Sequence, residues 1–155
     1  MSGDRALQVL IVSSTGGVLL DVLGLSPWWS QHTVHWAVVD GVDTAAAVGT
    51  EPHTWVAEHS ARRPATLLRG LREANAIISD VRPDMIVSAG TGAAVPFFVI
   101  ARIRRITTFW VSTLNLVDAP GLAARICSRV ASAVFVQRSS LGAAHAGSVV
   151  IGELY

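Results

Sequence analysis

The sequence contains no lysine, so arginine provides all twelve of its permanently cationic side chains. An arginine guanidinium is a rigid fork that binds carboxylates and phosphates through paired hydrogen bonds. Charged residues make up only 15% of the chain, against about 25% in typical soluble domains. The formal net charge is +1, so the overall charge does not indicate nucleic-acid binding and we expect no such partner.

Only one cysteine is present, Cys127, which excludes an intramolecular disulfide and is typical of a reducing compartment. It lies in the apolar repeat of an expected helix, so we predict that it is buried. The N-terminal segment MSGDRALQVLIVSS has too short an apolar run for a signal peptide. We therefore expect a cytoplasmic protein. The five histidines lack metal-ligand spacing, and we expect neither a metal nor a cofactor.

An uncharged stretch from Met85 to Ala101 contains the segment SAGTGAAVPF at residues 88–97. It fits three interpretations: a membrane span, a buried strand that runs into a helix, or a phosphate-binding loop. A span needs about 20 predominantly apolar residues that stay helical, and Gly90, Gly92 and Pro96 interrupt this one. The pattern favours a strand, a tight turn and a helix whose first turn holds Pro96, where a missing N–H costs little.

The rest of the chain alternates between strand-like and helix-like segments, which predicts one α/β domain over residues 1–155. We expect a doubly wound, mainly parallel, Rossmann-like sheet. Its apolar content of 51% implies that both faces of the sheet are buried, or that apolar surface is left for a partner or a bilayer. The predicted strands are Leu7–Ser13, Val34–Val39, Thr54–Val56, Met85–Ser88, Thr107–Val111 and Ala133–Val136. The predicted helices are Gly17–Leu23, Asp43–Ala47, Arg63–Val81, Ala93–Arg102 and Gly121–Ala131. The terminal VVIGELY is expected to hold one more strand or a domain junction.

Two glycine-containing turns join predicted strands to helices. The first is Ser14–Thr15–Gly16–Gly17, and the second is Gly90–Thr91–Gly92. In a doubly wound sheet such turns share the carboxyl edge of the strands, where helix N-termini present free N–H groups to ligands. A tight turn also needs glycine without any ligand. Neither turn matches G-x-G-x-x-G or a Walker A sequence, so the pattern leaves both interpretations open.

Five segments together resemble the acceptor-side subunit of split glycosyltransferases, two-chain enzymes of lipid-linked oligosaccharide and exopolysaccharide synthesis. The sequence is also similar to the N-terminal half of the peptidoglycan N-acetylglucosaminyltransferases. The resemblance covers nearly the whole chain. Its segments are SSTGG at 13–17, VVDGVDT at 38–44, ARRP at 61–64, RPDMIVSAGTGAAVPFF at 82–98 and DAPGLAARICSRVASAVFVQ at 118–137.

The resemblance implies the N-terminal half of a GT-B architecture that is divided between two polypeptides. This chain would bind a polyprenyl-diphosphate-linked acceptor at the inner face of the membrane, as a peripheral protein. A partner chain would bind the UDP-sugar, and one sugar, N-acetylglucosamine or a uronic acid, would be transferred with inversion. The lack of a nucleotide fingerprint agrees with this division.

The sequence departs from the family at positions that matter for chemistry. Val18 stands where the first turn commonly has histidine, Ser112 and Thr113 replace a glutamate and a serine, and Leu116 replaces an arginine. We therefore assign no catalytic base.

The resemblance assigns contacts with the acceptor diphosphate to both glycine turns. Asn115, in a loop that follows a strand, is a further candidate for substrate contact. Asp40 and His59 are possible polar residues of the cleft. Asp43 and Thr44 complete a D-x-x-D-T element, in which we expect Asp43 to cap the next helix. The diphosphate-contact candidates are Ser14, Thr15, Gly16, Gly17, Gly90, Thr91, Gly92 and Asn115.

The segment PFFVIARIRR combines apolar residues with three arginines, a pattern typical of amphipathic helices at anionic membranes. We predict membrane contact for Phe97, Phe98, Arg102, Arg104 and Arg105, with burial of the apolar residues in the core as the alternative. Adjacent tryptophans in GLSPWWSQH suit a membrane interface, a sugar platform, a partner contact or the core.

Two other functions remain open. One is a membrane anchor or scaffold that has lost catalytic activity, and the other is a free-standing small-molecule-binding domain. For the split enzyme we also expect that the partner-binding face allows an isolated chain to form a homodimer.

Overall fold

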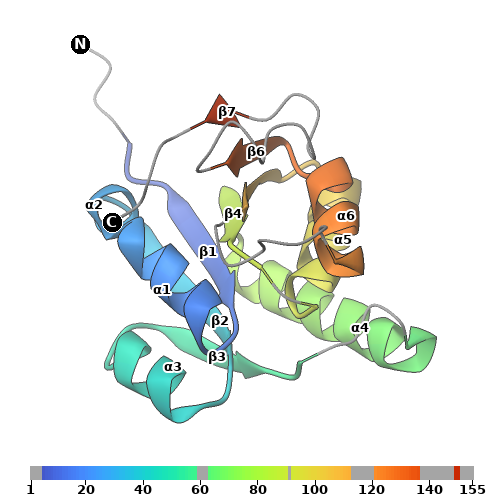
Figure 1. The fold of residues 1–155 in the computed structure, drawn as a ribbon, viewed down its shortest axis with the longest axis horizontal. Coiled ribbons are helices and arrows are strands. Elements are labelled where there is room, and N and C mark those ends of the chain that lie inside the picture. The colour runs from blue at the N-terminus through green and yellow to red at the C-terminus, as the bar shows by residue number, and fades with distance from the viewer. Residues whose placement is uncertain (1–4, 59–62, 91, 113–120, 137–148, 151–155) are drawn as a thin grey trace.

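The computed structural model describes residues 5–58, 63–90, 92–112, 121–136 and 149–150. Within these residues the chain forms a seven-stranded sheet in the order β3-β2-β1-β4-β5-β6-β7, in which every neighbouring pair is parallel (Figure 1). The strands are β1 (Gln8–Ser13), β2 (Thr33–Val39), β3 (His53–Val56), β4 (Met85–Ser88), β5 (Thr107–Ser112), β6 (Ala133–Val136) and β7 (Val149–Val150). The predicted doubly wound, Rossmann-like fold is therefore confirmed, and VVIGELY supplies the short β7.

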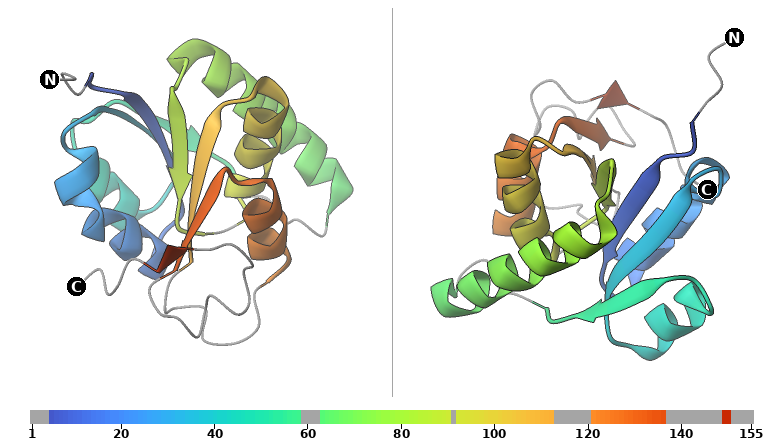
Figure 2. Two further views of the ribbon diagram at one scale, coloured as in Figure 1. Left: turned by 90° about the horizontal axis from the view of Figure 1, so that it is seen from above. Right: turned by 180° about the vertical axis from the view of Figure 1, so that it is seen from behind.

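Helices cover both faces of this sheet, as the two views of Figure 2 show. One face packs against α4, α5 and α6, and the other packs against α1, α2 and α3. The helices are α1 (Gly17–Gly24), α2 (Ser26–Trp29), α3 (Val42–Val48), α4 (Pro64–Val81), α5 (Ala94–Arg104) and α6 (Leu122–Val130). Each face has its own apolar core, which explains the high apolar content of the chain.

Local sequence explains where the helices begin and end. α4 starts at Pro64, whose fixed φ suits a first helical position, and its stripe of Ala74, Ile77 and Ile78 is buried. In α5, Pro96 lies in the first turn as predicted. Cys127 is buried in α6, also as predicted, and burial raises the pKa of its thiol.

The prediction that Phe97 and Phe98 contact a membrane is wrong, because these side chains are only 2% and 0% exposed. α5 lies between α4 and α6, so its first half is surrounded by protein and packs on the sheet. Phe98 meets Trp110 of β5 edge to face, with ring centroids 5.6 Å apart. Burial in the core, the alternative interpretation, is what the structure supports.

The adjacent tryptophans, Trp28 and Trp29, form part of the short helix α2. Trp29 donates from Nε1 to the carbonyl oxygen of Val22 at 2.9 Å and packs against Trp36, so it joins the core of that face. Among the helices of the described residues, none is both long and apolar enough to cross a bilayer.

Candidate functional site

The two glycine turns follow β1 and β4, which are adjacent parallel strands. Both turns therefore lie at the carboxyl edge of the sheet, side by side. The helices that follow, α1 and α5, start at this edge and present their first N–H groups there. This is the arrangement that the sequence predicted for a ligand site.

The first turn is held by an aspartate from the next strand–helix connection. Gly16 has φ 79° and ψ −144°, a conformation that is essentially restricted to glycine. Its N–H donates to Oδ2 of Asp43 at 2.7 Å, and the other carboxylate oxygen accepts from the N–H of Thr44 at 3.0 Å. Asp43 thus does not act as the N-cap of α3, a position that Gly41 occupies, but bridges α3 to the first turn.

The connection after β2 is itself held in place by Thr44 and by a close contact with the first turn. The buried hydroxyl of Thr44 is within donating distance of two carbonyl oxygens, that of Val39 at 2.8 Å and that of Gly41 at 3.0 Å. A Cβ at Gly41 would lie 2.5 Å from Cγ2 of Thr15. Gly41 therefore allows the first turn to approach this closely.

The second turn is shaped by Ser88, the buried last residue of β4. Its hydroxyl donates to the carbonyl oxygen of Gly90 at 3.1 Å and accepts from the N–H of Gly90 at 3.3 Å. A Cβ at Gly90 would lie 3.0 Å from Cγ2 of Val18. Val18 of α1 therefore packs directly against the second turn, so the two turns form one contiguous surface.

This surface can hold an anionic group through backbone N–H groups at the start of two helices. Ser13 and Ser14 are buried, and their hydroxyls donate to the backbone carbonyls of Ser14 and Thr15, so they shape the turn. Val18 places an apolar side chain where the family that the sequence resembles commonly has histidine. In the part of the chain that the structure describes, no group of three His, Cys, Asp or Glu side chains is placed to hold a metal ion.

The structure brings together most of the predicted diphosphate-contact residues, and their binding role stays a prediction. Asp40 lies exposed at the same edge, just after β2. Thr91, His59 and Asn115 lie outside the described residues. The hydrogen bond between Asp43 and Gly16 was not predicted from the sequence, in which the D-x-x-D-T element is the one feature that points to it.

The three arginines predicted to contact a membrane are exposed, but they lie at the opposite edge of the sheet. α5 begins at the carboxyl edge and ends at the amino edge, where Arg102, Arg104 and Arg105 are found. Arg104 donates to Oδ1 of Asn75 at 2.6 Å and to the hydroxyl of Ser79 at 2.8 Å, so it ties α5 to α4. β1 spans six residues, so its two ends are about 20 Å apart.

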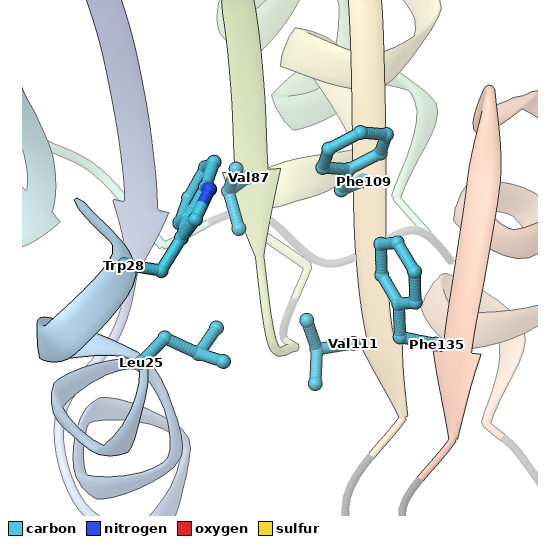
Figure 3. A pocket seen from close by; sticks show the side chains of 6 residues that line it. All are labelled: Leu25, Trp28, Val87, Phe109, Val111 and Phe135. Atoms are coloured by element: carbon cyan, nitrogen blue, oxygen red, sulfur yellow. The ribbon is translucent and has the colours of Figure 1, made fainter. Parts of the chain in front are cut away.

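A second feature is an apolar pocket on the face that carries α1 and α2 (Figure 3). These helices cover β1 and β2, and the pocket of about 190 Å³ opens beside them, over β4, β5 and β6. Phe109 and Phe135 pack edge to face in its wall, 5.1 Å apart. The lining residues are Leu25, Trp28, Val87, Phe109, Val111 and Phe135.

No protein-family model matches the sequence, and no curated protein matches it. The structure, however, is similar to several solved structures. MurG of Acinetobacter baumannii is 18% identical, with a TM-score of 0.73 over 93% of this chain. A UDP-N-acetylglucosamine 2-epimerase from Rickettsia bellii is 10% identical, with a TM-score of 0.74 over 97% of this chain.

A third similar structure is the UDP-GlcNAc 2-epimerase of Methanocaldococcus jannaschii in complex with UDP-GlcNAc and UDP, at 14% identity and a TM-score of 0.69 over 94% of this chain. The chain spans less than half of these proteins: 44% of MurG and 46% of each epimerase. At these identities the similarity establishes the fold alone, and the chain has the Rossmann-like α/β fold of GT-B-type proteins.

Proposed function

We propose that this chain is the acceptor-side half of a two-chain, inverting, UDP-sugar-dependent glycosyltransferase of GT-B type. In this proposal the acceptor is linked to a polyprenyl diphosphate, whose phosphates bind at the paired glycine turns. A separate partner chain binds the UDP-sugar and completes the cleft. The protein works at the inner face of the membrane, as a peripheral protein, because its acceptor is a lipid.

The observation that carries this proposal is the construction of the paired turns. Asp43 occupies the N–H of Gly16 and so fixes the shape of the first turn, and Val18 packs on Gly90, so the starts of α1 and α5 share one surface. In this proposal the phosphates bind N–H groups at the starts of these two helices and not the N–H of Gly16. A tight turn needs glycine, but it does not need an aspartate 27 residues away to hold it. Preorganised N–H groups at helix N-termini favour bound phosphate.

One further observation supports a lipid-linked acceptor. Val42 is 91% exposed beside Asp43 at the carboxyl edge, so apolar surface adjoins the proposed phosphate site.

The fold does not separate a transferase from an epimerase, because MurG and the epimerases match it about equally well. The sequence resemblance favours the transferase, since its segments follow the acceptor-side subunits along nearly the whole chain. A membrane anchor without chemistry is the second candidate. It is favoured by Val18, whose apolar side chain occupies the family's histidine position and packs against the second turn.

The test is sugar transfer from radiolabelled UDP-sugars to a polyprenyl-diphosphate acceptor, with and without the presumed partner chain. We expect transfer only when both chains are present. Gly16→Ala should abolish or strongly reduce transfer, because alanine disfavours the φ of 79° and so distorts the turn. Gly49→Ala is the matched control: Gly49 also has a positive φ, of 51°, and open space around it, but it ends α3 at the opposite edge.

Equal loss of transfer in both glycine variants would indicate general destabilisation and would count against a site at the turns. Failure of transfer to every acceptor, with partner binding intact, would favour the anchor.

A further inference from the structure

Five arginines gather at the amino edge of the sheet, where α4, α5 and α6 all end. Arg82 follows α4, Arg102 and Arg104 lie in the last turn of α5 with Arg105 just after it, and Arg129 lies in the last turn of α6. All five are exposed. α4, α5 and α6 run antiparallel to the strands, so their C-terminal ends lie at one edge of the sheet (Figure 2). Segments that are far apart in sequence therefore bring their arginines to this edge.

Three of these arginines line a cleft of about 510 Å³ between the ends of α5 and α6. They are Arg102, Arg105 and Arg129, and none of the other lining residues is acidic. The described residues provide no ion-pair partner for any of the three. Among the residues that the structure describes, the lining of the cleft therefore concentrates positive charge without an acidic side chain.

Ser132, which lines the cleft, is held in place by hydrogen bonds to Thr108 of β5. The N–H of Thr108 donates to the hydroxyl of Ser132 at 3.0 Å, and the N–H of Ser132 donates to the carbonyl oxygen of Thr108 at 2.9 Å. Ser132 itself lines the cleft, beside Thr107. Fixed hydroxyl and backbone groups thus accompany the three guanidinium groups.

Helix dipoles favour cations at helix C-termini, which accounts for Arg102 and Arg129. They also favour Arg105, the C-cap of α5, which has φ 59° in the left-handed region. Glycine is the usual residue at such a helix end, because a side chain there carries a conformational cost. Arg82 ends α4 in the same conformation outside the cleft, so this backbone conformation does not by itself indicate a ligand.

We propose that this cleft binds the phosphate or pyrophosphate group of a small soluble ligand. Three guanidinium forks can donate paired, charge-assisted hydrogen bonds to phosphate oxygens. The volume lies within the range of small-molecule sites, and the arginines line a hollow. The cleft is about 20 Å from the glycine turns, at the other end of the strands, so this site does not depend on the proposed transferase activity.

A lipid headgroup carries the same chemistry, and one neighbouring residue would suit a bilayer. Ile103 is 72% exposed between Arg102 and Arg104. A soluble ligand would not need this side chain, whereas a bilayer would gain from its insertion. The two sources of phosphate therefore predict different effects of substituting Ile103.

The test is calorimetric titration of the chain with inorganic pyrophosphate at low ionic strength. We expect saturable 1:1 binding that weakens about tenfold in Arg129→Ala, since each arginine–phosphate contact is charge-assisted. Arg125→Ala is the matched control, because Arg125 is exposed one turn earlier on α6 and does not line the cleft. It should change the affinity less than twofold, within the range of weak surface electrostatics.

A second pair of variants separates binding from folding. Arg105→Gly removes a cleft arginine but relieves the left-handed backbone, so it should weaken pyrophosphate binding without lowering Tm. Arg82→Gly makes the same change at the end of α4, where φ is 50°, outside the cleft, and should leave binding unchanged.

Co-sedimentation with phosphatidylglycerol vesicles is the parallel measurement. The proposal is overturned if pyrophosphate shows no saturable binding, or if Arg105→Gly and Arg129→Ala bind it as the unmodified chain does. Vesicle binding that requires Ile103 and Arg105, with no pyrophosphate binding, would instead show that the edge contacts a bilayer.

Discussion

At the scale of single residues, His35 shows how position within the sheet controls charge. It lies part-buried in β2, and its Nε2 is 2.9 Å from the hydroxyl of Thr54 on β3. Burial lowers the pKa of His35, against the opposing effect of Asp80, and the charge of His53 lowers it slightly further. The folded protein therefore holds this imidazole neutral at a pH where an unfolded chain would already begin to protonate it.

We predict that this difference makes stability fall in mild acid. Because the folded pKa lies below the unfolded value of about 6.5, the unfolded state binds the proton first. The contribution of His35 is fully present above that value and is lost as the pH falls through it toward the folded pKa. His35→Gln should remove this part of the pH dependence. The measurement is Tm from pH 8 to pH 5 for both proteins, and parallel curves would contradict the prediction.

Residues at the candidate site also show what a sequence can and cannot reveal. The glycines of both turns were predictable, because strand and helix patterns flank them. The bond between Asp43 and Gly16 was not, because it depends on β1 and β2 being neighbours with matching register. The packing of Val18 on Gly90 likewise requires β1 and β4 to be adjacent. Such contacts follow from strand order, which local patterns do not specify.

At the scale of elements, the surroundings of α5 explain why its sequence predicted membrane contact for Phe97 and Phe98, whereas the structure buries both side chains. The first half of the helix is buried on all sides and its last turn is exposed. Burial therefore changes from one end of the helix to the other, and it is not confined to one face. A pattern of apolar residues followed by arginines resembles an interfacial helix, but α4 and α6 flank α5 in the fold. The existence and approximate bounds of the helix were predictable, whereas its neighbours were not.

We predict that Phe98→Ala lowers the free energy of unfolding by about 3–5 kcal/mol, because it leaves a cavity beneath Trp110. Ile103→Ala, on the same helix, should change it by less than about 0.5 kcal/mol, since Ile103 is 72% exposed. Urea denaturation of both variants measures these changes. A small effect of Phe98→Ala, comparable to that of Ile103→Ala, would mean that the aromatic side chain is not part of the core.

At the scale of the whole molecule, the two faces of the sheet are covered unequally. α4, α5 and α6 cover one face, while on the other face no helix of the described residues covers the apolar pocket over β4, β5 and β6. The distance from the first to the third of three neighbouring strands is about 10 Å, which is close to the diameter of one helix. A partner chain, or a second copy of this chain, has room to pack there.

We therefore predict that the isolated chain self-associates through this face, because filling the apolar pocket would remove its lining from water. Phe109→Glu places a charge in the wall of the pocket and should shift the chain toward the monomer. Trp55→Glu is the control and should leave association unchanged, since Trp55 is a 41% exposed aromatic residue on β3, at the far side of the sheet.

Light scattering across a concentration series measures the molar mass, with circular dichroism to verify folding. A monomer at every concentration would contradict self-association. If added partner chain then binds the unmodified protein but not Phe109→Glu, the same face serves the partner; if both bind equally, the partner uses another surface.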